Sequence, residues 1–323
     1  MAFEPSSIQR ILLVKLRAIG DAVLTLPSLE ALHRGFPQAS ISVLCPPLAR
    51  EIYSEDPRVA EVLPYDKAWF KSLGHHARHA QGLQERHFDL AVCLHASTRS
   101  ALLGWLSGAP WRSIRNHSGP DWFSNLKARE PKEPKSIIQR DFDAIRALGL
   151  HPKDEEPRMA LAPWALQEAA ARWKALRLPA KGVLAVFPGA GKPEKRWPLD
   201  QWLSLAKALK RQGKTPLFLS APGEAGLAAE AQSVGGRWAS VDSLQVLGAL
   251  CQKSGRALGC DSGPRHIAAA VGARTLTLFG PETLREWHPY KEKDGHLAVQ
   301  EASGSMADLK VETVLARSWR WMR

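Results

Sequence analysis

Short apolar runs and amphipathic stretches alternate along this chain. The runs RILLVKL (10–16) and ISVLC (41–45) are continuously apolar, which is typical of strands buried on both faces of a parallel sheet. An amphipathic stretch between them predicts a helix to about Arg34. A further apolar strand is expected at 89–95. Strands that alternate with helices in this way predict an α/β fold.

The second half of the chain repeats this design. Its expected strands are 182–187, 215–220, 237–241, 256–260 and 274–279, and its expected helices are 198–212, 224–234, 243–253 and 264–271. Residues 150–163 are rich in charge and proline and predict a linker, and 112–135 predict a long polar loop. We therefore expect two Rossmann-like α/β domains, 1–160 and 161–305, facing a central cleft. A terminal helix at 306–323 follows, and packing back towards the first domain is one option for it.

Length and composition narrow the class of protein. A chain of 323 residues suits two domains of roughly 150 residues each. Its longest apolar runs are far short of the ~20 residues that span a bilayer, and the opening MAFEPSSIQR has no features of a secretory signal. The four cysteines are scattered, so we expect buried thiols in a reducing compartment and no zinc site. A cytoplasmic protein is expected, at most peripheral on the inner membrane.

The net charge of +12 is uneven, because residues 1–165 carry +3 and residues 166–323 carry +9. General solubility is the plain explanation. The sharper ones are an anionic ligand, such as a nucleotide diphosphate, or an anionic membrane surface. Nucleic acid is less favoured, because the basic residues are not interleaved with aromatic ones on one element.

The segment Cys260-Asp261-Ser262-Gly263-Pro264-Arg265-His266 joins a strand to a helix. The free N–H groups at such a helix start, together with the helix dipole, favour a phosphate. His266 falls in the first turn beside the same spot. An ordinary helix start and a satisfied core histidine are equally open interpretations.

A second strand end, Phe187-Pro188-Gly189-Ala190-Gly191, leads into a turn with three cations. These are Lys192, Lys195 and Arg196, and Glu194 is the one acid within the turn. The segment is not a phosphate loop of the Walker A type, because Val186 stands where its first glycine belongs. A solvated basic turn is the plain alternative, but two strand ends that both offer phosphate donors favour an anion site.

Two carboxylates follow other strand ends. Asp21 comes after the first strand, where it could act as a general base or simply cap a helix. Glu224 lies just past another strand, where it could accept the hydroxyls of a ribose or support the helix dipole.

Three segments together resemble the ADP-heptose:lipopolysaccharide heptosyltransferases of glycosyltransferase family 9. They are ILLVKLRAIGDAVLTLPSLEALHRGFP, FPGAGKPEKRWPLDQWLSLAKAL and GCDSGPRHIAAAVGARTLTLFGP, in that order. The resemblance spans nearly the whole chain and implies the GT-B fold, with an acceptor-binding first domain and a donor-binding second domain. It implies an inverting transfer of heptose from ADP-heptose to the lipid A-linked inner core of lipopolysaccharide.

The resemblance also implies roles for individual residues. Asp21 would be the catalytic base, Lys195 would bind the donor diphosphate, and Lys15 would support the charge near Asp21. Glu224 would hold the ribose. The other implied donor-binding positions are Gly189, Ala190, Gly191, Asp261, Ser262, Gly263 and His266, with Lys192 and Arg196 in support. No cofactor and no metal is expected, because basic residues and a helix end can serve the diphosphate.

Two positions depart from the family pattern. Phe187 stands where a polar residue such as Asn is more usual, and Gly191 lacks a hydroxyl that some members offer the phosphates. A related enzyme with another nucleotide-sugar donor and a different glycan acceptor is the alternative. A nicotinamide-dependent oxidoreductase is disfavoured, because the glycine fingerprint is missing. A silent binding module is disfavoured, because Asp21 and Lys195 are both present.

Two further patterns have an everyday explanation and a sharper one. The histidines at 75, 76, 79 and 87 are expected on a solvated helix face rather than at a metal. The tail ARSWRWMR mixes arginine and tryptophan, which suits either a membrane interface or a packed terminal helix. The central geometric expectation is that the turns 189–197 and 261–266 converge, across a cleft from Asp21.

Overall fold

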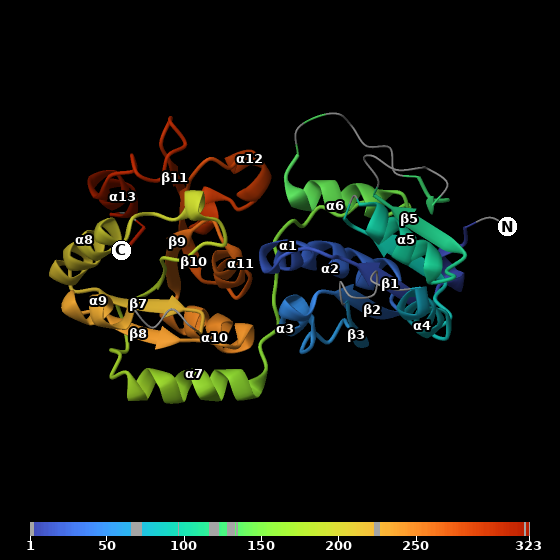
Figure 1. Ribbon diagram of the computed structural model, residues 1–323, viewed down its shortest axis with the longest axis horizontal. Helices are drawn as coiled ribbons and strands as arrows, with labels where there is room; N and C mark the ends of the chain where they lie inside the picture. Colours follow the sequence, from blue (N-terminus) through green and yellow to red (C-terminus); the bar gives the residue numbers. More distant parts are fainter. Residues whose placement is uncertain are drawn as a thin grey trace. The chain divides into compact units, whose positions relative to one another are not determined.

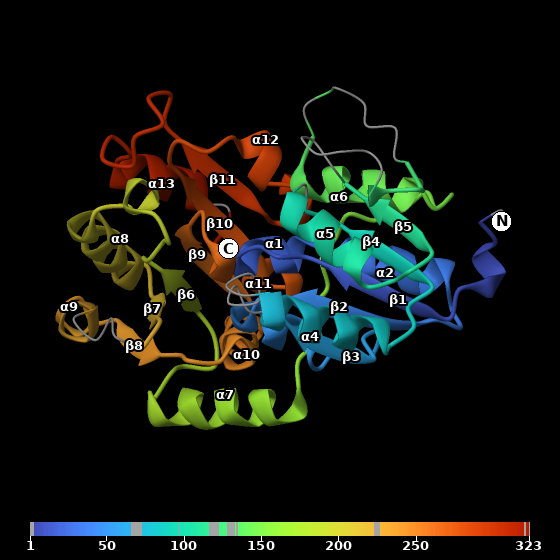
Figure 2. The ribbon, with the colours of Figure 1, turned by 45° about the vertical axis from the view of Figure 1, so that its right-hand side comes forward.

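The chain divides into two compact units, Met1–Ala160 and Leu161–Arg323 (Figures 1 and 2). The computed structural model describes residues 3–65, 73–95, 97–115, 123–127, 133, 135–222, 227–319 and 321–322, with backbone alone for 73–77 and 227. Each unit contains one parallel sheet with helices on both faces. The α/β fold expected from the sequence is confirmed.

The sheet of the first unit has the order β3-β2-β1-β4-β5. Its strands are β1 (Arg10–Val14), β2 (Ser40–Cys45), β3 (Glu61–Pro64), β4 (Leu90–Cys93) and β5 (Trp111–Ile114). All neighbours pair in parallel. Because the chain moves from β1 to β2 on one side and returns to β4 on the other, the strand order reverses between β1 and β4.

Helices cover both faces of this first sheet. One face carries α1 (Ile19–Leu24), α2 (Leu26–Gly35) and α6 (Ile137–Arg146), which contact one another. The other carries α4 (Leu73–Gln84) and α5 (Thr98–Leu106). The short α3 (Arg50–Tyr53) follows β2. Alternate residues of β1, such as Leu12 and Val14, pack in the core beneath α4 and α5, as the period of two in a strand requires.

The second sheet has the order β11-β10-β9-β6-β7-β8, again parallel throughout. Its strands are β6 (Val183–Phe187), β7 (Thr215–Ser220), β8 (Arg237–Ser240), β9 (Arg256–Cys260), β10 (Arg274–Phe279) and β11 (Leu297–Gln300). The order reverses between β6 and β9. These two strands run unusually close, because a Cβ added at Gly259 would lie 2.8 Å from Cβ of Phe187.

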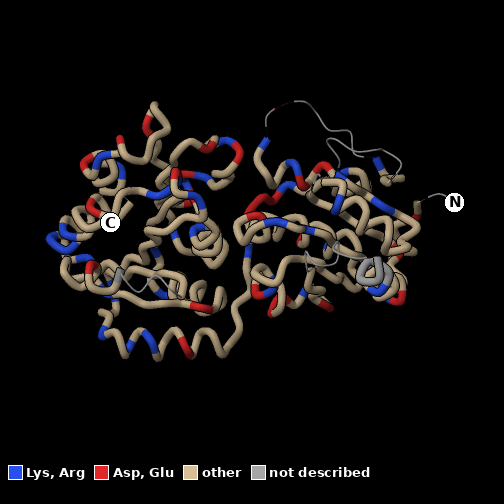
Figure 3. Tube along the Cα trace, in the orientation of Figure 1, with Lys and Arg blue, Asp and Glu red and all other residues tan. Residues whose placement is uncertain are grey.

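The helices of the second unit also form two layers. On one side lie α7 (Pro163–Ala175), α10 (Leu244–Ser254) and α11 (Gly263–Ala270); on the other lie α8 (Leu199–Arg211), α9 (Leu227–Ser233) and α13 (Val311–Ser318). The one-turn α12 (Leu284–Trp287) follows β10. Lys and Arg recur along α7 and α8 (Figure 3), so part of the positive charge of this half lies on solvated helices.

Strands β7, β9 and β10 have the bounds expected from the sequence, and the other expected strands begin and end within two residues of the expected bounds. One expectation was wrong: the polar loop assigned to 112–135 overlaps β5, which begins at Trp111. The strand WRSI contains no continuous apolar run from which a strand could be predicted. Main-chain pairing with Leu90–Cys93 holds it at the edge of the sheet. Strand β11 and helix α12 were not expected.

The end of the chain packs within the second unit. Helix α13 contacts α8 and β11. Beyond it, Trp321 and Met322 are buried in the core, and the Trp321 indole donates a hydrogen bond to the Gly295 carbonyl. Trp319 is 49% exposed. Among the described residues, no helix combines the length and apolar character needed to cross a bilayer.

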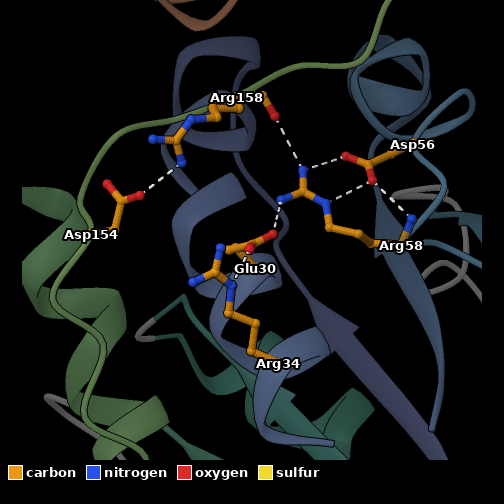
Figure 4. A network of polar contacts seen from close by, with 6 residues as sticks. All are labelled: Glu30, Arg34, Asp56, Arg58, Asp154 and Arg158. Atoms are coloured by element: carbon orange, nitrogen blue, oxygen red, sulfur yellow. Dashed lines mark hydrogen bonds and ion pairs between the residues drawn. The ribbon is translucent and has the colours of Figure 1, made fainter. Parts of the chain in front are cut away.

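An ion-pair network holds the segment after α6 on the first unit (Figure 4). The Arg58 guanidinium binds both carboxylate oxygens of Asp56, Glu30 Oε2 at 2.8 Å and the carbonyl of Arg158 at 3.1 Å. Arg158 in turn pairs with Asp154. Arg58 thus holds Arg158, which lies in the expected linker 150–163, against the first unit.

Replacing Arg58 by alanine should destabilise the first unit by about 3 kcal/mol, because it leaves the Asp56 carboxylate buried without its cation. Urea unfolding followed by tryptophan fluorescence measures this loss. Arg34→Ala is the matched control: Arg34 also pairs with Glu30, but its side chain is 73% exposed, so a change within about 0.5 kcal/mol is expected. Equal losses in both variants would contradict the structural role of Arg58.

Candidate functional site

In the second unit, the carboxyl ends of β6, β9 and β10 lie side by side, because these strands are neighbours in the sheet. The turn after β6 carries Lys195, the residue after β9 is Asp261, and the loop after β10 carries Glu282. Ligands of open α/β sheets bind at this edge, where the strand order reverses. The three side chains therefore mark a candidate site.

The two turns predicted to converge do so. Lys195 Nζ lies 2.9 Å from Asp261 Oδ2, which joins the turn after β6 to the start of α11. The Trp197 N–H contacts Cys260 Sγ at 3.5 Å, and the Arg196 guanidinium donates to the Ala190 carbonyl at 2.8 Å. These contacts fix the turn against β9.

Glu282 completes the ion cluster. Its Oε1 lies 3.0 Å from Lys195 Nζ and 3.5 Å from Lys192 Nζ. Burial by itself would lower the pKa of Lys195, but hydrogen bonds and charge from Asp261 and Glu282 outweigh it and raise this pKa. Lys195 is therefore a firmly charged ammonium. The acids that balance Lys195 therefore follow β9 and β10 and do not come from the turn itself.

Arg265 is the second cation on Asp261. Its guanidinium is almost fully buried, and Nη2 lies 2.6 Å from Asp261 Oδ1 and 2.7 Å from the Trp287 carbonyl. The guanidinium also stacks over the Phe279 ring at 5.2 Å. Burial would raise the pKa of Asp261, but the charges of Arg265 and Lys195 hold it below its usual value. Asp261 is thus a carboxylate clamped between two cations.

Helix α11 begins beside this clamp. Ser262 is its N-cap residue, and Gly263 and Pro264 form its first two positions, one residue earlier than expected. The Ser262 hydroxyl donates to the Cys260 carbonyl at 3.2 Å instead of capping the helix. The first N–H groups of a helix have no partner within it, so this end can receive an anion.

His266 is buried, with both ring nitrogens engaged. Nδ1 lies 2.7 Å from the Tyr290 hydroxyl, and Nε2 lies 3.0 Å from Arg265 Nη2. Burial and the Arg265 charge hold the pKa of His266 well below its usual value, so the ring is neutral. These contacts match a satisfied core histidine. A direct contact of His266 with a donor stays a prediction.

The glycine turn after β6 is open at Gly191. A Cβ added there would meet nothing within 4 Å, so space does not exclude a hydroxyl-bearing residue at this position. Gly189, Arg196 and Trp202 are among the residues that line an adjoining pocket of about 370 Å³. Lys195 and Asp261 are not among the residues that line it. The pocket therefore adjoins the ion cluster and does not contain it.

In the first unit, charged groups gather at the carboxyl ends of β1 and β5. Lys15, directly after β1, is buried and donates to Asp141 Oδ2 of α6 at 2.6 Å. Arg115, directly after β5, lies 3.8 Å from Asp141 Oδ1. Burial raises the pKa of Asp141 to about 6, although both cations oppose the rise. The charge of Asp21 acts on the same carboxyl.

Asp21 is the third residue of α1, whose N-cap is Ala18. The plain alternative that Asp21 caps this helix is therefore wrong. The side chain is 7% exposed, and the Thr25 hydroxyl donates to the Asp21 carbonyl. Nearby, Arg17 Nε donates to His95 Nδ1 at 3.2 Å. Burial and the surrounding cations lower the pKa of His95 to about 4, so this imidazole is neutral.

Sequence reasoning missed several partners in both clusters: Glu282, Arg265, Trp287 and Tyr290 in the second unit, and Asp141, Arg115 and His95 in the first. Arg265 had a local signal, its place four residues after Asp261 in the segment already singled out. Glu282 and His95 share another, a polar residue just past a buried strand. Glu224 lies outside the described residues, so its ribose role stays a prediction. Among the described side chains, no group of three or more His, Cys, Asp or Glu is placed to hold a metal ion.

The fold and these clusters define a two-unit Rossmann-like protein with a cationic site at the strand-order reversal of its second sheet. The model of a family described as glycosyltransferase family 9 (heptosyltransferase) matches residues 76–316. The chain belongs to this family, and it is a glycosyltransferase, as its resemblance predicted.

Individual relatives agree with this assignment. Lipopolysaccharide heptosyltransferase 3 of Escherichia coli is 24% identical over 294 residues, which cover 85% of this chain and 84% of the relative. The crystal structure of a family 9 glycosyl transferase from Veillonella parvula has a TM-score of 0.86 at 18% identity, covering 99% and 98% of the two chains. Escherichia coli heptosyltransferase WaaC, solved with ADP-2-deoxy-2-fluoro heptose, has a TM-score of 0.77 at 19% identity, covering 97% and 99%.

Proposed function

We propose that this protein transfers heptose from ADP-heptose to the lipid A-linked inner core of lipopolysaccharide, with inversion at the anomeric carbon. The observation that carries the proposal is the meeting of Lys195 with the N-terminus of α11 at the strand-order reversal. An ammonium and a helix start suit a diphosphate. The names of the relatives supply the sugar and the acceptor: a lipopolysaccharide heptosyltransferase and a heptosyltransferase with an ADP-heptose analogue.

The proposed chemistry is a direct displacement. Asp21 removes the proton from an acceptor hydroxyl as its oxygen attacks the anomeric carbon, and the bond from that carbon to the diphosphate breaks. Lys195 and the α11 N-terminus stabilise the charge that builds on the departing ADP. Preorganised donors of this kind are worth about 3 kcal/mol each. Lys15, held in place by its ion pair with Asp141, helps to stabilise the negative charge near Asp21.

The remaining implied contacts complete the proposed donor site. Gly189, Ala190 and Gly191 would face the phosphates with Lys192 and Arg196 in support, and Glu224 would accept the ribose hydroxyls. No metal or cofactor takes part in the proposed reaction. We place the enzyme in the cytoplasm, with peripheral contact to the inner membrane where its acceptor lies. In the described part of the tail, Trp319 is 49% exposed, whereas Trp321 is buried.

A transfer assay with a defined acceptor tests this proposal. The purified protein should convert ADP-heptose and heptose-free lipopolysaccharide core into ADP and the extended core, detected by mass spectrometry. ADP should also stabilise the protein against heat more than UDP or GDP at equal concentration. Stabilisation by UDP alone, with transfer from a UDP-sugar, would replace the proposal with the alternative of a different donor and glycan acceptor.

A further inference from the structure

The Lys195 ammonium already binds two carboxylates of the protein. It donates to Asp261 Oδ2 at 2.9 Å, lies 3.0 Å from Glu282 Oε1, and sits 5.7 Å from the centre of the Trp287 ring. An ammonium has three N–H donors. Two of them are taken by carboxylates, so a diphosphate oxygen that binds on that side of Lys195 displaces a carboxylate partner.

Asp261 is held too firmly to be that partner. Its side chain is 4% exposed, and its Oδ1 lies 2.6 Å from the buried Arg265 guanidinium, a contact that does not involve Lys195. Because Arg265 is fixed by the Trp287 carbonyl and two aromatic rings, Asp261 stays neutralised when Lys195 turns to another anion.

Glu282 has the opposite character. Its side chain is 27% exposed, and among the described residues its ion-pair partners are Lys195 and Lys192, the cations assigned to the diphosphate. Its backbone is pinned, because Gln300 Nε2 donates to the carbonyls of both Gly280 and Glu282. A Cβ at Gly280 would lie 2.9 Å from the Glu194 carbonyl, so this loop is pressed against the basic turn. The carboxylate can swing away while its loop remains in place.

We propose that Glu282 is a displaceable carboxylate that occupies the anion position between Lys192 and Lys195, and that a nucleoside diphosphate bridging these two lysines expels it. The inference rests on the proposed diphosphate site and adds a residue that sets its affinity. After displacement the Glu282 carboxylate remains close to the bound phosphates, because its loop stays in place. The negative charges of the carboxylate and the phosphates then repel each other. Glu282 thereby weakens diphosphate binding and favours release of the ADP product.

Glu282→Gln is the decisive variant, because it removes the charge and keeps the size. We expect ADP to bind about tenfold tighter, which corresponds to about 1.4 kcal/mol. The gain should be smaller for AMP and absent for adenosine, because it follows phosphate charge. Titration calorimetry of the three ligands measures it, and kcat should fall as ADP release slows. A general structural role for Glu282 would not produce this dependence on phosphate number.

Glu194→Gln is the matched control. Glu194 is an exposed acid next to Lys195 in sequence, so its loss changes the net charge of the turn equally. We expect ADP affinity to change less than twofold in this variant. An equal increase in ADP affinity in both variants would show that Glu282 acts only through the net charge of the turn, and it would overturn the inference. Unchanged or weaker ADP binding in Glu282→Gln would overturn it too.

Inorganic pyrophosphate separates this inference from the proposed function. Tighter pyrophosphate binding in Glu282→Gln, in a protein that transfers no heptose, would keep the displaceable carboxylate and refute the proposed reaction. Heptose transfer by the native protein, with no change in pyrophosphate or ADP affinity on substitution, would refute the inference alone. A native protein that binds neither ADP nor pyrophosphate would overturn both.

Discussion

Replacing Asp21 by asparagine is expected to reduce the turnover of heptose transfer by a factor of about 10²–10⁴. Asparagine keeps the shape of the side chain but cannot take a proton from the acceptor hydroxyl. Asp21 lies in the first unit, whereas the proposed diphosphate contacts lie in the second. The affinity for ADP should therefore stay within about twofold of the native value.

Initial-rate kinetics with the lipopolysaccharide-core acceptor, paired with calorimetry of ADP binding, measure both quantities. Asp200→Asn serves as the control, because Asp200 is also an acid in the first turn of a helix, α8. It removes the same dipole interaction, worth about 0.3–1 kcal/mol, without touching the proposed chemistry. Near-native turnover in Asp21→Asn would remove this residue from the mechanism.

Replacing Lys195 by alanine is expected to weaken ADP binding and to lower kcat by about 10²–10³-fold. The ammonium is held by two carboxylates at the proposed diphosphate position, and the charge on the leaving group is largest in the transition state. Asp261 retains its Arg265 partner in this variant, so the local fold should survive. The free energy of unfolding should fall far less than the activity.

Lys192→Ala provides the comparison for this prediction. Lys192 carries the same charge three residues away, but its side chain is 62% exposed and its contact with Glu282 is longer, at 3.5 Å. We expect its loss to weaken ADP binding by only a few-fold, because solvent screens an exposed charge. Equal ADP affinity in the native protein and in Lys195→Ala would refute the role of Lys195.

Much of the fold and part of the candidate site followed from local signals. The run VLAVF and the run ALGC after Arg256 are continuous apolar stretches of strand length, and each is followed by a turn and a helix. Parallel strands bring such turns to one edge of a sheet, which is why the Lys195 and Asp261 turns could be expected to meet. Strand β5 escaped prediction because its stabilisation comes from pairing with β4 rather than from its own side chains.

The sequence by itself therefore determined the α/β class, most strand positions, and the two strand ends that carry cations and a helix start. The tertiary structure alone decided which charges meet. Lys15 forms an ion pair with Asp141, 126 residues away in the sequence, and Lys195 forms one with Asp261, 66 residues away. Hydrophobic periodicity and turn chemistry act within a few residues, whereas an ion pair depends on the order of strands in the sheet. The partners Asp141 and Glu282 became visible only in the folded sheets, whereas Arg265 is local, four residues beyond Asp261.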